Sequence, residues 1–277
     1  MFKTVLGIVG VNQGDRDLRA VMDLVAATGS HLSVLVVSLA GPPPIGGYAE
    51  VVSDVWLHER EDDKAKLGER LRLARVQLER SGLSHDVEAV YLEVAWADDR
   101  IGERARYADL TIVGPDLMAN GKLKNAALGG ALFQSARPVL LLPGSAKATL
   151  QPKNILLAWD SRTEAARAAG CAIELMKGAE NVRITLVDPV SSYLASGAEP
   201  GADVATYLAR HGIKVTVDQL AGGGRLVAEV LNRHAIDTGS DMIVMGAYGH
   251  SRLKERIFGG VTKSMIENAE VPILMAH

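Results

Sequence analysis

The chain of 277 residues has a single cysteine, few aromatic residues and almost no excess of either charge. Cys171 alone cannot form an intrachain disulfide, and its place on an apolar helical face indicates packing. Aromatic residues make up 4% of the chain and the formal charge is −3, so the composition gives no sign of a nucleic-acid partner. These absences, with 48% hydrophobic residues, are typical of an ordinary soluble globular protein.

Long hydrophobic runs are also missing. The segment from Val5 to Val11 is apolar, but it is too short to cross a membrane. It also lacks the basic lead and the small-residue cleavage site of a signal peptide. We therefore expect it to be the first strand of a protein with no membrane partner and a cytoplasmic location.

The sequence contains no pattern typical of a catalytic or metal site. Its histidines are scattered, and no Ser-His-Asp arrangement stands out in the order of the chain. The paired carboxylates Asp98-Asp99 and Glu61-Asp62 lie in charged stretches, where a solvated face is the simpler interpretation. No Walker A run ending in Gly-Lys-Ser/Thr is present. We therefore predict no catalytic residue and no metal ligand.

Apolar runs typical of buried strands alternate along the chain with segments whose apolar residues recur at helical spacing. The chain is also long enough for two domains of about 140 residues. A long charged helix is predicted from about Val52 to Ser81, after a Pro- and Gly-rich turn at Pro42 to Gly47. Alternating strands and helices imply doubly wound parallel sheets. The predicted strands are 3–9, 31–39, 86–92, 110–114 and 138–143 in the first half, and 154–159, 182–187, 213–220, 242–245 and 272–276 in the second.

The second half repeats the pattern of the first. Phe2 to Leu6 matches Pro152 to Leu156, and Asp109 to Gly114 matches Asp241 to Gly246. A period near 140 residues indicates duplication of a domain. The polar segment Gly144 to Pro152 is the best linker candidate. We therefore predict one domain over residues 1–146 and a second over residues 151–277.

One stretch of the second half predicts a ligand site. The run Met242 to Met245 has no polar alternation, as expected of a strand buried on both faces. Gly246 and Gly249 then let the backbone turn sharply and approach a ligand closely. Gly259-Gly260 follows, before a helix predicted from Thr262 to Asn268, whose free N–H groups would attract phosphate.

The spacing G-x2-G-x9-G at the end of a parallel strand resembles the ATP-binding signature of universal stress proteins. The resemblance covers nearly the whole chain. It implies an α/β fold of two tandem doubly wound, five-stranded parallel sheets that are Rossmann-like, similar to universal stress proteins and adenine nucleotide α-hydrolases, and form an intrachain pseudo-dimer. Pairing of two chains into a homodimer stays open. The family often has Ser or Thr after the distal glycine, where this chain has Gly260.

The resemblance also implies the site residues. Asp160 matches an aspartate that contacts the nucleoside, although it could equally cap the following helix, and Leu186 matches a position where the backbone reads adenine. The glycine loop would hold the phosphates of ATP, and Mg²⁺ would arrive with the nucleotide. The predicted cofactor-binding set is Ala158, Trp159, Asp160, Leu186, Met245, Gly246, Gly249, His250, Gly259, Gly260, Val261 and Thr262.

The first half departs from this pattern at the same positions. Gly10 stands where the second half has Asp160, and Leu117 stands where it has Gly249. Pro115 removes a backbone donor from a loop that runs on to Gly129-Gly130. We therefore expect the first half to be a degenerate partner that does not bind ATP in the family manner.

Three functions remain compatible with the sequence. The leading one is a stress-response regulatory protein that binds ATP in its C-terminal domain, hydrolyses it slowly at most, and acts on an unidentified protein partner. An adenylyl-transferring enzyme of the α-hydrolase group would need a Ser- or Gly-rich pyrophosphate loop directly after the first strand of the second half, and the segment Trp159 to Thr163 is not such a loop. A nucleotide-free adaptor or scaffold is favoured by Gly260 in place of a hydroxyl residue.

Overall fold

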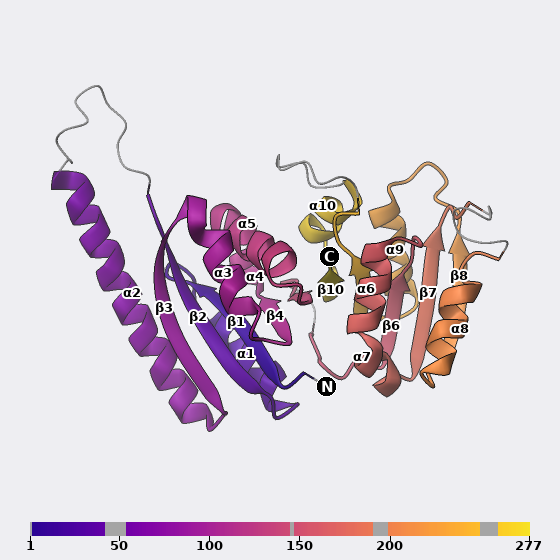
Figure 1. Cartoon of the computed structure of the whole chain (residues 1–277), viewed down its shortest axis with the longest axis horizontal. Coiled ribbons are helices and arrows are strands. Elements are labelled where there is room, and N and C mark those ends of the chain that lie inside the picture. The colour runs from indigo at the N-terminus through magenta and orange to yellow at the C-terminus, as the bar shows by residue number, and fades with distance from the viewer. Residues whose placement is uncertain (1, 42–53, 145–146, 191–198, 250–259) are drawn as a thin grey trace. The chain divides into compact units, whose positions relative to one another are not determined.

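The computed structural model describes residues 2–41, 54–144, 147–190, 199–249 and 260–277. It divides the chain into two compact units (Figure 1), Phe2–Arg137 and Pro138–His277. The predicted turn at Pro42 to Gly47 lies outside the described residues. None of the described helices combines the length and the apolar character that crossing a membrane requires.

The N-terminal unit contains a parallel sheet in the order β3-β2-β1-β4. Its strands are β1 (Thr4–Gly10), β2 (His31–Ala40), β3 (His85–Glu93) and β4 (Leu110–Val113). The strands β1 and β4 are buried along almost their whole length, which explains why their sequences show no polar alternation. β3, which pairs with β2, is partly exposed along its length.

Helices cover both faces of this sheet (Figure 1). α1 (Arg16–Ala26) and the long α2 (Asp54–Ser81) lie on one face, and α3 (Ala97–Ala105) and α5 (Gly121–Gly129) lie on the other. Two side chains of β3, five positions apart, show the alternation: Tyr91 faces α2, where it contacts Arg60, and Asp86 faces α3, where it contacts Arg104. The short elements η1 (Val94–Trp96), α4 (Pro115–Met118) and the π-helical turn η2 (Gly130–Gln134) complete this unit.

The C-terminal unit contains the strand order β5-β10-β9-β6-β7-β8. Its strands are β5 (Val139–Leu141), β6 (Asn154–Ala158), β7 (Asn181–Val187), β8 (Val215–Leu220), β9 (Met242–Gly246) and β10 (Ile273–Ala276). All pair in parallel except β5, which runs antiparallel to β10. The helices are α6 (Thr163–Cys171), α7 (Ile173–Gly178), α8 (Ala202–Arg210), α9 (Val227–Asp237) and α10 (Gly260–Glu267).

The predicted fold class is confirmed, with two local differences. The sequence predicted five parallel strands in each half, whereas β5 is antiparallel and groups with the C-terminal unit. The segment after Gly114 was predicted to be a loop, but Pro115 begins α4 and α5 follows it directly. Proline is well tolerated at the first position of a helix, because its missing N–H would have no partner there. The domain limits at 146 and 151 and the pseudo-dimer stay predictions.

Candidate functional site

A cavity of about 300 Å³ lies at the carboxyl edge of the C-terminal sheet, where β6, β7 and β9 end. The carboxyl ends of parallel strands are where open α/β sheets bind ligands. The first turn of α10 closes the cavity on another side. Its lining residues are Ala158, Trp159, Asp160, Arg162, Glu164, Ala165, Thr185, Val187, Val227, Leu231, Met245, Gly246, Tyr248, Gly249, Gly260, Val261 and Thr262.

Most of the predicted site residues line this cavity together: Ala158, Trp159, Asp160, Met245, Gly246, Gly249, Gly260, Val261 and Thr262. Leu186 does not, and its side chain is 2% exposed. Its neighbours Thr185 and Val187 line the cavity instead, because successive side chains of a strand point to opposite faces. His250 and Gly259 lie outside the described residues.

The glycines of this edge differ in how strictly packing requires them. A Cβ atom on Gly246 would lie 2.5 Å from the backbone nitrogen of Ala165, so α6 can pack on the strand end only against glycine. A Cβ on Gly249 would lie 3.1 Å from Cδ of Arg162 and 3.3 Å from Oε2 of Glu164. No atom of the described residues lies within 4 Å of that position on Gly260. Gly260 is therefore free to carry a side chain.

A hydrogen bond ties the loop after β9 to the start of α10. The backbone N–H of Tyr248 donates to Oγ1 of Thr262 over 3.1 Å. Tyr248 has a φ of 60°, the left-handed region that costs a non-glycine residue free energy. Burial raises the pKa of the Tyr248 phenol well above its usual range. Thr262 thus fixes the loop after β9 through its hydroxyl oxygen.

Asp160 shapes the turn before α6, and its contact with a nucleoside stays a prediction. Its Oδ1 accepts a hydrogen bond from the backbone N–H of Arg162 over 3.1 Å, which holds the turn before α6. The guanidinium of Arg162 lies 3.6 Å from Oδ2, but both side chains are exposed, so this ion pair contributes little stability. The carboxylate therefore stays open to the cavity while it shapes the turn.

Among the polar groups of the site that sequence reasoning missed is a buried threonine hydroxyl. Oγ1 of Thr185 is buried and has no hydrogen-bond partner among the described residues, although Thr185 lines the cavity. A buried hydroxyl without a partner costs free energy, which a ligand atom at this point would recover. The signal in the sequence was a polar residue one position before Leu186, at the end of an otherwise apolar strand.

The corresponding edge of the N-terminal unit is filled by its own side chains. A Cβ on Gly10 would lie 2.8 Å from Cδ2 of Leu123, and the Gly10 N–H donates to Oε1 of Gln13 over 2.6 Å. Leu117, at the position of Gly249, is completely buried. The space that a ligand would need is therefore occupied.

A buried carboxylate takes the backbone donors after β4. Asp17 accepts hydrogen bonds from the N–H groups of Asp116 at 2.9 Å and Leu117 at 2.8 Å. Its side chain lies against Gly114, as Glu164 lies against Gly246 in the other unit. Burial raises the pKa of Asp17, against the opposing effect of these two hydrogen bonds. The amides that could face a phosphate are thus bound within the unit.

Metal ligands do not gather at this site or elsewhere in the described part of the chain. Among residues 2–41, 54–144, 147–190, 199–249 and 260–277, no three His, Cys, Asp or Glu side chains come together as a cation site.

The fold and this edge define a doubly wound α/β protein with a glycine-flanked cavity at the ends of its parallel strands. The model of the Universal stress protein family matches residues 152–277. Residues 152–277 therefore match a universal stress protein domain, which confirms over this part of the chain the resemblance found in the sequence.

Similar proteins agree with this assignment. Universal stress protein Slr1230 of Synechocystis sp. (strain ATCC 27184 / PCC 6803 / Kazusa) is 31% identical over 67 residues, which cover 24% of this chain and only 22% of that protein. A universal stress protein structure from Archaeoglobus fulgidus DSM 4304 covers 99% of this chain and 95% of its own, with a TM-score of 0.67 and 18% identity. A candidate universal stress protein from Pseudomonas aeruginosa UCBPP-PA14 covers 99% and 93%, with a TM-score of 0.58 and 17% identity. At these identities, the two structures show the fold alone.

Proposed function

We propose that the C-terminal domain binds ATP and that the protein acts as a nucleotide-dependent regulator in the stress response. The observation that carries this proposal is the cavity that brings the Asp160 carboxylate and the glycine loop together. Its volume of about 300 Å³ is at the lower end of the range for small-molecule sites.

Each part of the nucleotide has a counterpart in the cavity. The Asp160 carboxylate accepts hydrogen bonds from the ribose hydroxyls, as acidic residues do in other nucleotide folds. The end of β7, with the Thr185 hydroxyl and Val187, receives the adenine. The N–H groups of Gly249, Gly260 and Val261 face the phosphates, and the Thr262 hydroxyl and the helix dipole of α10 add to them.

The proposed role is to bind ATP rather than to hydrolyse it. Backbone donors hold an anion in place, but the described residues of the cavity include no histidine that could act as a general base. Mg²⁺ would arrive with the nucleotide, coordinated mainly by its phosphates. The N-terminal unit would bind no ATP, because Leu123 and Asp17 occupy the corresponding space and donors.

Calorimetric titration with Mg-ATP tests this proposal, with Gly249→Leu compared with the wild type. The leucine copies Leu117 of the other unit and places a side chain in the cavity beside Arg162. Gly178→Leu is the matched control, because Gly178 lies in α7 outside the cavity and has no atom within 4 Å of its Cβ position.

We expect one site per chain in the wild type and in Gly178→Leu, and none in Gly249→Leu, with all three proteins equally folded by circular dichroism. Two sites would contradict the assignment of the N-terminal unit. A wild type that binds no adenine nucleotide would overturn the proposal and favour the nucleotide-free adaptor.

A further inference from the structure

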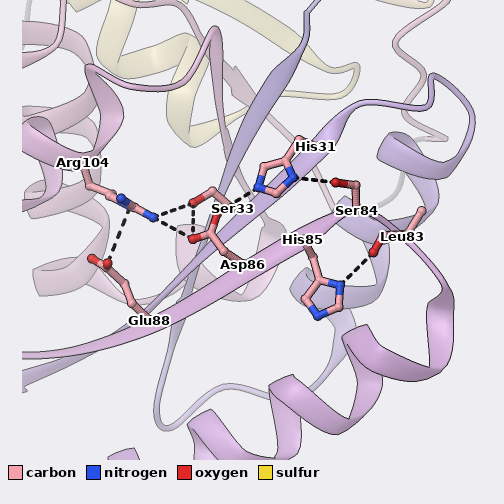
Figure 2. Close-up of polar contacts among 8 residues, drawn as sticks. All are labelled: His31, Ser33, Leu83, Ser84, His85, Asp86, Glu88 and Arg104. Atoms are coloured by element: carbon pink, nitrogen blue, oxygen red, sulfur yellow. Dashed lines mark hydrogen bonds and ion pairs between the residues drawn. The ribbon is translucent and has the colours of Figure 1, made fainter.

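A second polar cluster lies in the N-terminal unit, at the amino ends of β2 and β3 on the face covered by α3. Figure 2 shows a row of contacts that runs from Ser84 through His31 to Asp86. Oγ of Ser84 lies 2.8 Å from Nδ1 of His31, and Nε2 of His31 lies 2.9 Å from Oδ1 of Asp86. The side chain of His31 is 37% exposed, so the row is accessible to solvent.

The carboxylate end of this row is firmly held. Oδ2 of Asp86 accepts a hydrogen bond from Ser33 at 3.0 Å and from Nη2 of Arg104 at 2.6 Å. Glu88 lies on the far side of the Arg104 guanidinium, at 3.8 Å (Figure 2). Burial raises the pKa of Asp86, but the hydrogen bonds from His31 and Ser33 and the charge of Arg104 outweigh it and hold this pKa below its ordinary value.

An ionised Asp86 determines the tautomer of His31. A carboxylate can only accept hydrogen bonds, so Nε2 of His31 carries the proton that it donates to Asp86. In the neutral ring, Nδ1 is then left with its lone pair and accepts the hydrogen bond from the Ser84 hydroxyl. A serine, a base and a carboxylate that orients the base are the three parts of an activated nucleophile.

We infer that Ser84 is a nucleophilic serine, with His31 as its general base and Asp86 as the positioning residue, and that it accepts acyl groups from small activated esters. Neither this activity nor its location depends on the nucleotide site, which lies in the other unit.

The reaction is an acyl transfer followed by hydrolysis. Oγ of Ser84 attacks the ester carbonyl while its proton passes to Nδ1 of His31, and Asp86 stabilises the imidazolium that forms. The bond to the leaving alcohol breaks, and the alcohol departs with the proton from His31. Water then attacks the acyl group by the same route, which releases the carboxylic acid and restores the Ser84 hydroxyl.

We expect this activity to be slow. Neither the cavity of the C-terminal unit nor the smaller one between α2 and β3 is lined by Ser84, so nothing shown here encloses a substrate. Each hydrogen-bond donor of an oxyanion hole typically raises the rate by a factor of about 10² to 10³, and an open site lacks this contribution. Aryl esters, whose leaving groups need little assistance, are therefore the appropriate probe.

The test is the reaction of the full chain with 4-nitrophenyl acetate, followed by release of 4-nitrophenol and by peptide mass spectrometry. We expect acetylation of Ser84 about 100-fold faster than acetylation of Ser81, an exposed serine in the same turn that contacts only the backbone. Ser84→Ala should remove the label and the fast release together.

His31→Gln should slow the reaction by about 100-fold, whereas His85→Gln should leave it unchanged. His85 is a matched control, because it neighbours Ser84 in sequence but contacts the carbonyl oxygen of Leu83 (Figure 2). Asp86→Asn should slow the reaction and change its pH profile, and Asp86→Glu should partly restore the rate. A merely structural role of Asp86 would produce neither the changed pH profile nor the partial rescue.

Each variant is first checked by circular dichroism for an unchanged fold. Acetylation of Ser84 no faster than that of Ser81 would overturn the inference. So would an unchanged rate in His31→Gln, or an acetyl group found on His31 itself. The row would then only link β2 and β3.

Discussion

Two glycines at the same sheet edge show how differently single residues constrain this site. Gly246 is required by packing, because any side chain would press into the backbone of α6. Gly260 begins α10 with open space around it, so packing does not explain its choice. In the sequence both look like loop glycines. Only the atoms around them in the structure show that Gly246 is required and that Gly260 can be replaced.

Gly260→Ser should therefore improve ATP binding. The change restores the hydroxyl that the family often has at this position, and a new hydrogen bond to a charged phosphate contributes about 1.5 kcal/mol. We expect an affinity for Mg-ATP about 10-fold higher by calorimetry, with adenosine affinity unchanged. A serine variant that binds ATP no better than the wild type would show that the phosphates do not reach the start of α10.

Asp160→Ala should affect the opposite end of the nucleotide. Loss of the hydrogen bonds that we propose between this carboxylate and the ribose hydroxyl groups removes about 1.5–3 kcal/mol, which weakens binding about 10- to 100-fold. Because adenosine has the same ribose as ATP, both affinities should fall by the same factor. A loss confined to ATP would place Asp160 near the phosphates and contradict its assignment.

At the scale of the elements, an ion pair holds α2 against the start of α1. Asp15 occupies the N-cap position of α1, but its side chain forms no capping hydrogen bond. It accepts instead from Nη1 of Arg70 at 2.6 Å and from Gln77 at 2.6 Å, both on α2. The hydrogen bond from Arg70, the strongest of these effects, lowers the pKa of Asp15. Asp15 therefore docks α2 rather than capping α1 through its side chain.

Asp15→Asn should destabilise the protein in a way that depends on pH. The buried Arg70 side chain, 7% exposed, would keep its charge without a counterion. Such a loss costs about 3–5 kcal/mol when both partners are buried, and we expect about 2–3 kcal/mol because Asp15 is 32% exposed.

The pKa of Asp15 is lower in the folded state, so its stabilising contribution is present above the unfolded pKa near 3.9 and disappears as the pH falls through the folded pKa. Urea unfolding at pH 7 should separate the wild type from Asp15→Asn, and the two curves should approach each other below about pH 4. Asp23→Asn, an exposed change on the same helix, is the control. A difference that persists at low pH would mean that the charge is not its cause.

The elements also show how far the sequence can be interpreted. Buried parallel strands such as β1 and β9 are predictable, because burial on both faces leaves a continuous apolar run. The reason for a glycine at position 130 was not predictable. A Cβ on Gly130 would lie 2.3 Å from the carbonyl oxygen of Asp98, so this glycine permits close packing against α3. The row from Ser84 to Asp86 was also missed, because it depends on the register that places β2 beside β3.

The site itself was largely predictable, since its residues follow the strand ends in a fixed order. Asp160 lies just after the end of β6 and Gly246 ends β9, and parallel neighbours bring these strand ends to one edge. What the sequence could not give was the side chains that approach from α6, Arg162 and Glu164. Their positions depend on how closely that helix packs on Gly246.

At the scale of the whole molecule, the boundary between the compact units differs from the boundary between the sequence repeats. β5 precedes the predicted linker, yet it pairs with β10 and groups with the C-terminal unit. Its residues Val139, Leu140 and Leu141 are at most 1% exposed. The family match begins at residue 152 and leaves this strand out. A stable C-terminal fragment should therefore begin before β5.

Fragments 138–277 and 152–277 test this boundary. Without β5, the edge of β10 loses its hydrogen-bond partner, and an open edge pairs readily with another chain. Because each buried Val or Leu side chain contributes about 1.5–3 kcal/mol before the cost of ordering, we expect the shorter fragment to lose about 3 kcal/mol of unfolding free energy. It should also dimerise in sedimentation, while the longer fragment stays monomeric. Equal urea midpoints and two monomers would instead place the boundary at the repeat, with β5 dispensable to the domain for which we propose nucleotide binding.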